Sequence, residues 1–397
     1  MLGRRFFLKR FSSFVFLLLA IEMLDEVVFG MREAAWPLMR DDLHLTYVQI
    51  GLLNAIPSVI ANLIEPIFGI LGDTSRRRQL VIGGGVVLGA GLILSGLSPS
   101  FVVLLVAFII VYPATGAFVS LSQAVLMDLE PERHEQNMAR WALAGSLGQV
   151  TGPLFLGLAV ALGGGWRELF GILGVVTLGL ALIARRFSFA AGSAGDDEDE
   201  DSFGLVEGLR EAARALRRGA VLRWMALLQF ANLMLDILLG YLALYFVDVV
   251  RTSESEAGIA VAIFTGVGLL GDVLLIPLLE RVRGLTYLRF SVLIQIVVFG
   301  TFLLTPVVEL KLVLIGLVGF FNAGWYSILQ GQFYSSMPGQ SGTVMALGNV
   351  SELVGGLLPL LIGVLAEQLG LGSAMWFLML GPVALLVGLP RAKARMD

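Results

Sequence analysis

Long apolar segments follow one another along nearly the whole chain, and short polar connections separate them. A helix needs about 20 mostly apolar residues to cross a bilayer, so each segment predicts one transmembrane helix. Six predicted spans precede a long polar segment: Phe11–Leu38, Thr46–Gly72, Gln79–Leu97, Phe101–Met127, Ala139–Leu162 and Trp166–Ala184. Six follow it: Val221–Val250, Glu256–Leu279, Leu285–Thr305, Leu310–Tyr334, Thr343–Leu369 and Leu371–Leu389. The pattern predicts an all-α membrane protein with twelve transmembrane helices.

The polar segment divides the chain into two bundles of six helices, residues 1–184 and 221–397, joined by the linker 185–220. The linker contains an acidic run from Asp196 to Asp201, which is typical of disorder, and then an amphipathic stretch. That stretch predicts a helix on the membrane surface, or a solvated tether between the bundles. Polar residues match between the halves in one register, such as Glu65 with Asp272, which indicates two pseudo-symmetric bundles.

Composition supports a membrane protein, because 57% of the 397 residues are hydrophobic and only 15% are charged. Soluble domains average about 45–50% apolar and about 25% charged residues. The chain has no cysteine and two histidines, so a thiolate or multi-histidine metal site is not expected. Basic residues gather in the connections on one side, and the positive-inside rule then predicts a multi-pass protein of the cytoplasmic membrane with both termini cytoplasmic.

The connection after the second span carries a motif. The run from Gly69 to Arg78 reads GILGDTSRRR and resembles the cytoplasmic motif G-x-L-A/G-D-R/K-x-G-R/K-R/K of the major facilitator superfamily of secondary transporters. The resemblance implies a fold of two six-helix bundles and gives Asp73, Arg77 and Arg78 the role of a latch between the halves. The segment from Leu63 to Asp73 is also similar to fosmidomycin-resistance-type exporters.

The fifth span carries a second motif. Gly148, Gly152, Pro153 and Gly157 resemble the antiporter-associated pattern G-x-x-x-G-P-x-x-G-G of the same family, and close helix packing is the alternative interpretation. The fourth span lacks the arginine that the family carries there, and Tyr112 takes its place.

Polar side chains inside the spans predict the functional site, because charge in a bilayer is costly. The first span places Glu22, Asp25 and Glu26 near mid-depth, on a stripe that continues through Phe29 and Arg32 to Trp36. Acids so close together disfavour one another's ionised form, so one of them can carry a coupling proton. Pairing of Arg32 with Glu33 or Asp25 for structural reasons is the alternative for that arginine.

Other spans add residues to the predicted site. Asp236 is expected to join the proton-coupling or substrate-binding group, and Glu65 and Asp272 are expected in gating. The predicted substrate cavity also contains polar and aromatic residues from both halves: Phe29, Trp36, Tyr112, Gln123, Gln149, Gln229, Asn232, Asn322, Trp325, Tyr326, Gln330 and Glu352.

These patterns predict a proton-coupled antiporter that exports a small cationic, zwitterionic or amphipathic solute by alternating access. It would use no cofactor, with the proton gradient as its energy source, and no nucleic acid or obligate protein partner. An importer or lipid flippase of the same fold is the alternative within transport. A sensor or intramembrane enzyme is less favoured, because no nucleophile–base pair, HExxH motif or phosphate-binding loop is visible.

Overall fold

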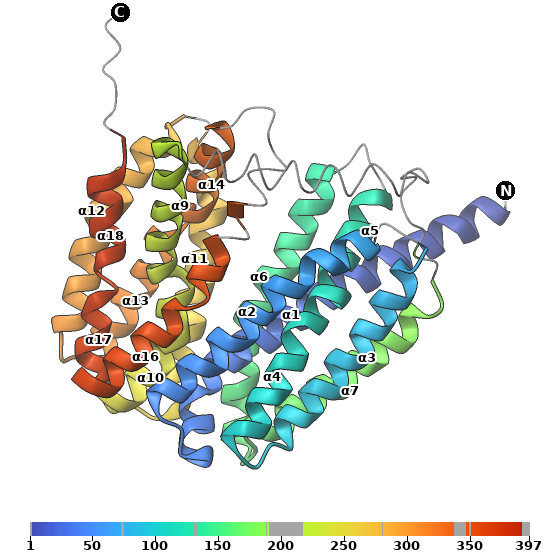
Figure 1. Cartoon of the computed structure of the whole chain (residues 1–397), viewed down its shortest axis with the longest axis horizontal. Helices are drawn as coiled ribbons and strands as arrows, with labels where there is room; N and C mark the ends of the chain where they lie inside the picture. Colours follow the sequence, from blue (N-terminus) through green and yellow to red (C-terminus); the bar gives the residue numbers. More distant parts are fainter. Residues whose placement is uncertain are drawn as a thin grey trace, which may run out of the picture. The chain divides into compact units, whose positions relative to one another are not determined.

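The structure is a computed structural model that describes residues 2–72, 75–129, 134–187, 189, 217–279, 281–336, 347–348 and 351–390. Asp73 and most of the linker, including its acidic run and amphipathic stretch, lie outside these residues. The chain divides into two compact units (Figure 1). The N-terminal unit comprises Met1–Gly195 and Glu254–Ala262, and the C-terminal unit comprises Asp196–Ser253 and Ile263–Asp397.

The described residues of both units form helices and no strand. The N-terminal unit contains α1 (Leu2–Leu43), α2 (Tyr47–Gly72), α3 (Arg77–Gly96), α4 (Phe101–Thr115), the π-helix η1 (Gly116–Ser120), α5 (Leu121–Leu129), α6 (His134–Ala161) and α7 (Trp166–Ala184). α1 packs along α6, and α3 packs along α7 and α4.

The C-terminal unit has more interruptions. Its seventh span consists of α9 (Gly219–Asn232), the π-helix η3 (Leu233–Ile237), α10 (Leu238–Tyr245) and the π-helix η4 (Phe246–Val250). It is followed by α11 (Glu254–Leu279), which belongs to this unit from Ile263 onward, and by α12 (Gly284–Leu304), α13 (Val308–Asn322), α14 (Trp325–Ser335), α16 (Leu358–Leu369), α17 (Leu371–Phe377) and α18 (Leu380–Gly388). The predicted tenth span is found as the apolar stretch Val308–Phe333, within which Gly324 adopts a φ of 72° and separates α13 from α14.

Eleven stretches of the described chain are long and apolar enough to cross a membrane. α1 is not among them, because Glu22, Asp25 and Glu26 interrupt its apolar sequence. It is nevertheless one helix of 42 residues, about 63 Å long at about 1.5 Å per residue. With α1 as the first span, the predicted total of twelve is reached.

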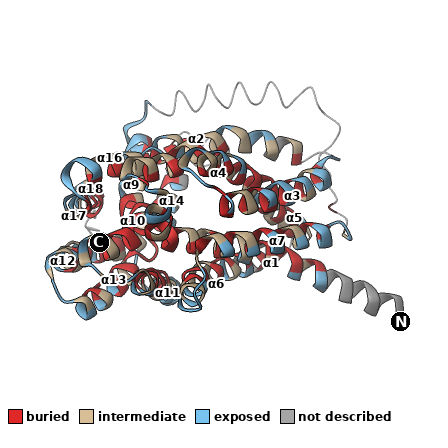
Figure 2. Cartoon of the chain, turned by 90° about the horizontal axis from the view of Figure 1, so that it is seen from below, coloured by how far each residue is buried: buried red, intermediate tan, exposed pale blue. Residues whose placement is uncertain are grey.

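Burial follows the environment expected in a bilayer (Figure 2). α10 is buried on nearly all sides, whereas α12 exposes Phe290, Leu293 and Val297. Exposed apolar side chains of this size are stable where lipid replaces water.

Candidate functional site

The first site feature is the contact between α1 and α6. A Cβ atom added at Gly152 would lie 2.5 Å from the carbonyl oxygen of Val27 and 2.6 Å from the nitrogen of Met31. One added at Gly148 would lie 2.8 Å from the Cβ of Glu26. Only glycine allows the two backbones to approach this closely, which confirms the packing interpretation for Gly148 and Gly152, whereas a Cβ at Gly157 would meet nothing within 4 Å.

Glu22 lies in this contact as a buried carboxyl group. Its side chain is 8% exposed, and a Cβ at Gly145 would lie 2.6 Å from its Oε1 atom. The space that Gly145 leaves is therefore filled by the Glu22 carboxyl. Glu22 takes part in none of the ion pairs found in the described part of the chain. Glu26 approaches the same glycine, with its Cγ 3.4 Å from the added Cβ position.

Asp25 points toward a different neighbour. It is half-buried, and the hydroxyl of Thr115 donates to its Oδ1 at 3.4 Å. Thr115 is the last residue of α4 before the π-helix η1. The structure thus divides the predicted stripe, because successive residues of a helix are about 100° apart: Glu22 and Glu26 face α6, and Asp25 faces α4.

Glu65 of α2 also lies at the junction between α4 and η1. A Cβ at Gly116 would be 2.7 Å from its Cγ and 2.9 Å from its Oε1. Thr115, which bonds Asp25, and Gly116, which Glu65 approaches, are successive residues of this junction. Glu65 was predicted in gating, and the structure brings it to the junction that Asp25 contacts.

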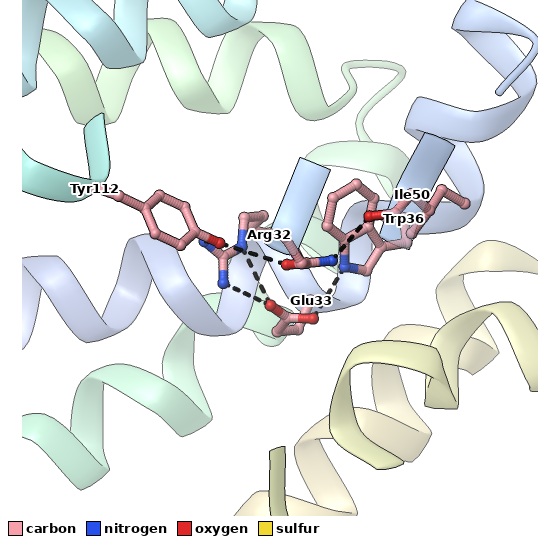
Figure 3. A network of polar contacts seen from close by, with 6 residues as sticks. Arg32, Glu33, Trp36, Ile50 and Tyr112 are labelled. Atoms are coloured by element: carbon pink, nitrogen blue, oxygen red, sulfur yellow. Dashed lines mark hydrogen bonds and ion pairs between the residues drawn. The ribbon is translucent and has the colours of Figure 1, made fainter. Parts of the chain in front are cut away.

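Arg32 is held in a polar network shown in Figure 3. Its Nη2 atom lies 2.6 Å from Oε1 of Glu33, and its Nη1 donates to the hydroxyl of Tyr112 at 2.7 Å. The guanidinium also lies over the rings of Phe29 and Tyr112, 5.1 Å from each centroid. The alternative interpretation of Arg32, an ion pair with Glu33, is confirmed. Tyr112, which stands where the resembled family carries an arginine in the fourth span, thus contacts the guanidinium of Arg32 from α1.

The network continues on both sides of this pair. The indole of Trp36 donates to the second oxygen of Glu33 at 2.9 Å, and Tyr112 donates to Oδ1 of Asn54 at 3.4 Å. Trp36 is fully buried and packs edge-on against Phe108. It was predicted to line the cavity, but in this structure its ring leaves no surface for a solute and instead supports Glu33.

In the C-terminal unit, Gln229 resembles Glu22 in its placement. Its Nε2 donates to the hydroxyl of Ser351 at 2.8 Å, and Gly355 leaves room for its Oε1. That oxygen is buried and accepts no hydrogen bond from the described residues. Asn232 is half-buried, and Asp236 is exposed within η3.

The predicted site residues of the tenth span differ in how far they are buried. Asn322 is 5% exposed and Trp325 is fully buried, with the Trp325 indole donating to Ser291 at 2.9 Å. Tyr326 is 57% exposed, and Gln330 is half-buried. Only the last two therefore offer side-chain surface to a solute in this structure.

The remaining predicted residues have simpler surroundings. Asp272 accepts a hydrogen bond from the Gly324 N–H at 3.1 Å, at the break between α13 and α14. Glu352 is exposed, and Gln123 and Gln149 are half-buried. No three His, Asp or Glu side chains of the described ranges converge as metal ligands would.

Of the predicted latch, Arg77 and Arg78 are described. Arg77 is buried and forms an ion pair of 2.5 Å with Asp128, and it also donates to the carbonyl of Gly72 at 2.5 Å. Arg78 donates to the carbonyl of Arg185 at 2.7 Å. All these partners belong to the N-terminal unit, so a role between the halves stays a prediction.

Three features were not found from the sequence. Asp128 is the acid that pairs with Arg77. Lys311, on α13, is 4% exposed and donates to the Tyr245 hydroxyl at 2.9 Å and to the Phe302 carbonyl at 2.6 Å. The third is a polar face of α12 formed by Tyr287, Ser291 and Gln295, whose spacing of four residues was a usable signal.

Comparisons with known proteins agree on one family. The family model described as Major Facilitator Superfamily matches residues 15–359. A fosmidomycin resistance protein of Escherichia coli (strain K12) is 26% identical over 170 residues, which are 42% of this chain and 41% of that protein. A chloramphenicol resistance protein of Pseudomonas aeruginosa is 31% identical over 183 residues, 44% of this chain and 42% of that protein. The matches thus span about two fifths of each relative.

Solved structures support the fold. A bacterial homologue of the human lysosomal transporter Spinster has a TM-score of 0.74 at 18% identity, covering 96% of this chain and 94% of its own. A mutant of the nucleoside transporter NupG has a TM-score of 0.78 at 12% identity, with 95% of this chain and 98% of that chain covered. The predicted fold and family are confirmed.

Proposed function

Because the chain belongs to the major facilitator superfamily, and so is a membrane transporter and not an enzyme, we propose that it exports small organic cations or amphipathic solutes in exchange for protons. The proton gradient across the cytoplasmic membrane would be its energy source, without a cofactor.

The observation that carries this proposal is the distribution of charge on α1. Arg32, its one cation at this depth, is neutralised by Glu33 and covered by Tyr112. Glu22 and Asp25 have no such partner, since neither takes part in an ion pair of the described residues. An anionic solute would find the guanidinium already occupied, whereas a proton or a cation would relieve the cost of the buried acids.

The surroundings of the two acids favour different roles. Glu22 is buried in the contact with α6, where there is room for a proton but not for an organic solute. Asp25 is half-buried, and the aromatic rings of Phe29 and Tyr112 belong to the same part of the unit. We assign the coupling proton to Glu22 and the cationic group of the solute to Asp25, with the rings adding cation–π and apolar contacts.

The direction of transport draws support from the relatives, since both are named for resistance to an antibiotic. A transporter confers resistance when it moves a compound out of the cell. Fosmidomycin and chloramphenicol are therefore suitable test solutes beside a lipophilic cation such as ethidium.

Purified protein in liposomes with an acidic lumen provides the test. Wild-type protein should accumulate ethidium, and a protonophore should abolish the accumulation. Glu22→Gln should lose the accumulation but keep ethidium exchange between equal pH values, whereas Asp25→Asn should lose both. Exchange of one proton for one monovalent cation moves no net charge, so the pH gradient alone drives it, and each pH unit is worth about 1.4 kcal/mol, or about tenfold accumulation.

Two outcomes would overturn the proposal. If the protonophore does not change ethidium flux through wild-type protein, proton coupling is wrong. If fosmidomycin is transported and ethidium is not, the assignment of a cationic solute is wrong. Asp41→Asn is the control, because Asp41 is an exposed acid near the end of the same helix, and its accumulation should still respond to the protonophore.

A further inference from the structure

A chain of side-chain amides connects three helices inside the C-terminal unit. Nε2 of Gln295, on α12, donates to Oδ1 of Asn322 at 3.0 Å. Nδ2 of Asn322, at the end of α13, donates to the carbonyl of Met234 at 2.6 Å. Met234 belongs to η3, the π-helical segment of the seventh span. We call this chain the amide relay.

The position where the relay ends is structurally unusual. A π-helix bonds each carbonyl to the N–H five residues ahead, so its transitions to α-helix disturb the regular pairing, and such segments often mark functional sites. Inside a bilayer every backbone group needs a partner within the protein. The short bond from Asn322 to Met234 thus acts on the backbone of η3 itself, two residues before Asp236.

The relay is not explained by stability alone. Gln295 is fully buried, and its Oε1 accepts no hydrogen bond from the residues that the structure describes. A buried acceptor without a donor costs free energy, and an apolar side chain of the same shape would avoid that cost. The amide is therefore better explained by the geometry that it fixes than by the bonds that it adds.

The face of α12 shows why the relay can be precise. Tyr287, Ser291 and Gln295 follow at intervals of four residues and bond, in turn, the Ala323 carbonyl, the Trp325 indole and the Asn322 amide. These three partners surround the break between α13 and α14. Asp272 of α11 holds the Gly324 N–H from another helix. The turn that follows Asn322 is thus held by α11 and α12, so the side chain of Asn322 bonds η3 from a fixed position.

We propose that Gln295 and Asn322 are positioning residues for the solute site: the amide relay sets the conformation of η3 and thereby places Asn232 and Asp236. This inference rests on the proposed transport function. Neither Gln295 nor Asn322 touches the solute. Asn322, predicted from the sequence to line the cavity, acts through the seventh span.

The test uses near-isosteric variants that cannot form the relay, Gln295→Met and Asn322→Leu. Ser291→Ala is the matched control, since it removes the neighbouring bond to Trp325, one turn away on the same helix, without touching η3. Hydrogen exchange is measured for a peptide covering residues 233–238, together with the KM and kcat of ethidium transport and the melting temperature.

Both relay variants should speed exchange in this peptide and raise the KM for ethidium, each by about two- to tenfold, the effect of one lost hydrogen bond. Any change in kcat should be no larger than the change in KM. In a double variant with Asp236→Asn, the KM effects should not add, because relay and acid act at one place. Ser291→Ala should lower the melting temperature and leave exchange and KM unchanged.

If both relay variants lower the melting temperature as Ser291→Ala does, with wild-type exchange and KM, the relay is structural only and the inference fails. It also fails if exchange rises without a change in KM. The exchange experiment needs no solute, so its result stands apart from the transport assay. If Asp25→Asn loses proton-driven transport while the relay variants show wild-type hydrogen exchange, the proposed function is retained and the role of the amide relay is rejected.

Discussion

The first and seventh spans occupy equivalent positions in the two halves, and they solve a similar packing problem with different chemistry. Glu22 fits its carboxyl over Gly145 of α6, and Gln229 fits its amide beside Gly355. α1 is one unbroken helix, whereas the seventh span alternates between α- and π-helix. Of these two spans, the one with carboxyl groups at the matching positions therefore has the regular backbone, and the one with amides there has the irregular backbone.

The two halves also differ in how they hold a buried cation. Arg32 is paired with the carboxylate of Glu33, whereas Lys311 has two oxygen acceptors, Tyr245 and the carbonyl of Phe302, and lies over both of their rings. In the first arrangement the carboxylate of Glu33 neutralises the guanidinium of Arg32. In the second arrangement both acceptors of Lys311 are uncharged oxygens. The comparison predicts that charge changes are costly in the first half and mild in the second.

The largest effect is expected for Glu33→Gln. It leaves the guanidinium of Arg32 buried without its carboxylate, which should lower the free energy of unfolding by about 3–5 kcal/mol. Thermal unfolding of the purified protein in detergent measures the change. Asp41→Asn is the control, because Asp41 is exposed and lies 3.7 Å from Arg40, and such a pair is worth about 0–1 kcal/mol. Equal shifts for the two variants would contradict a buried, paired network.

The next effect concerns the α1–α6 contact that carries Glu22. Gly152→Ala puts a Cβ against the backbone of Val27 and Met31, and overpacking of this kind costs about 1–3 kcal/mol. Gly157→Ala on the same helix meets nothing within 4 Å, and should be neutral or stabilise by up to about 1 kcal/mol. The two melting temperatures decide the matter, and a neutral Gly152→Ala would rule out the close approach.

A smaller effect is expected when the glycine beside each of these two groups is replaced, and it distinguishes the carboxyl group of Glu22 from the amide of Gln229. Gly145→Ala brings a Cβ to 2.6 Å from the Glu22 carboxyl. Because the end of a side chain can move, stability should change little, but proton-driven accumulation should fall about tenfold, or about 1.4 kcal/mol. Gly355→Ala crowds Gln229 in the same way and should leave the response to a protonophore intact. If Gly355→Ala uncouples transport equally, the coupling proton does not belong to the first half alone.

Much of the fold could be predicted from the sequence, because apolar length and turn composition are local signals. The spans, the two sets of six and the small-residue packing of Gly148 and Gly152 needed no knowledge of neighbours. The break at Gly324 was missed because apolar residues continue through it. Its stability depends on Asp272 and the α12 face, which are distant in sequence.

The candidate site was predictable in its members but not in its partners. Periodicity placed Glu22, Asp25 and Arg32 on one helix, but which neighbour each side chain meets is decided by tertiary packing. Trp36 and Asn322 show the limit. An aromatic or amide side chain in a span predicts a polar or cation-binding surface, yet both are buried and support other groups.

The smallest effect is expected for Lys311→Met, which tests the second half of the comparison. Lys311 forms no ion pair among the described residues, and its partners are a hydroxyl and a carbonyl. Methionine fills a similar volume, packs against the rings of Tyr245 and Phe302, and removes the cost of a buried charge, so the free energy of unfolding should change by less than about 1 kcal/mol in either direction. Arg32→Met is the matched control, because the same replacement there leaves the Glu33 carboxylate buried and unpaired and should cost about 3–5 kcal/mol. Thermal unfolding of both variants under one condition gives the comparison. A loss for Lys311→Met as large as that for Arg32→Met would mean that the lysine is neutralised by an acid, and the contrast between the halves would not hold.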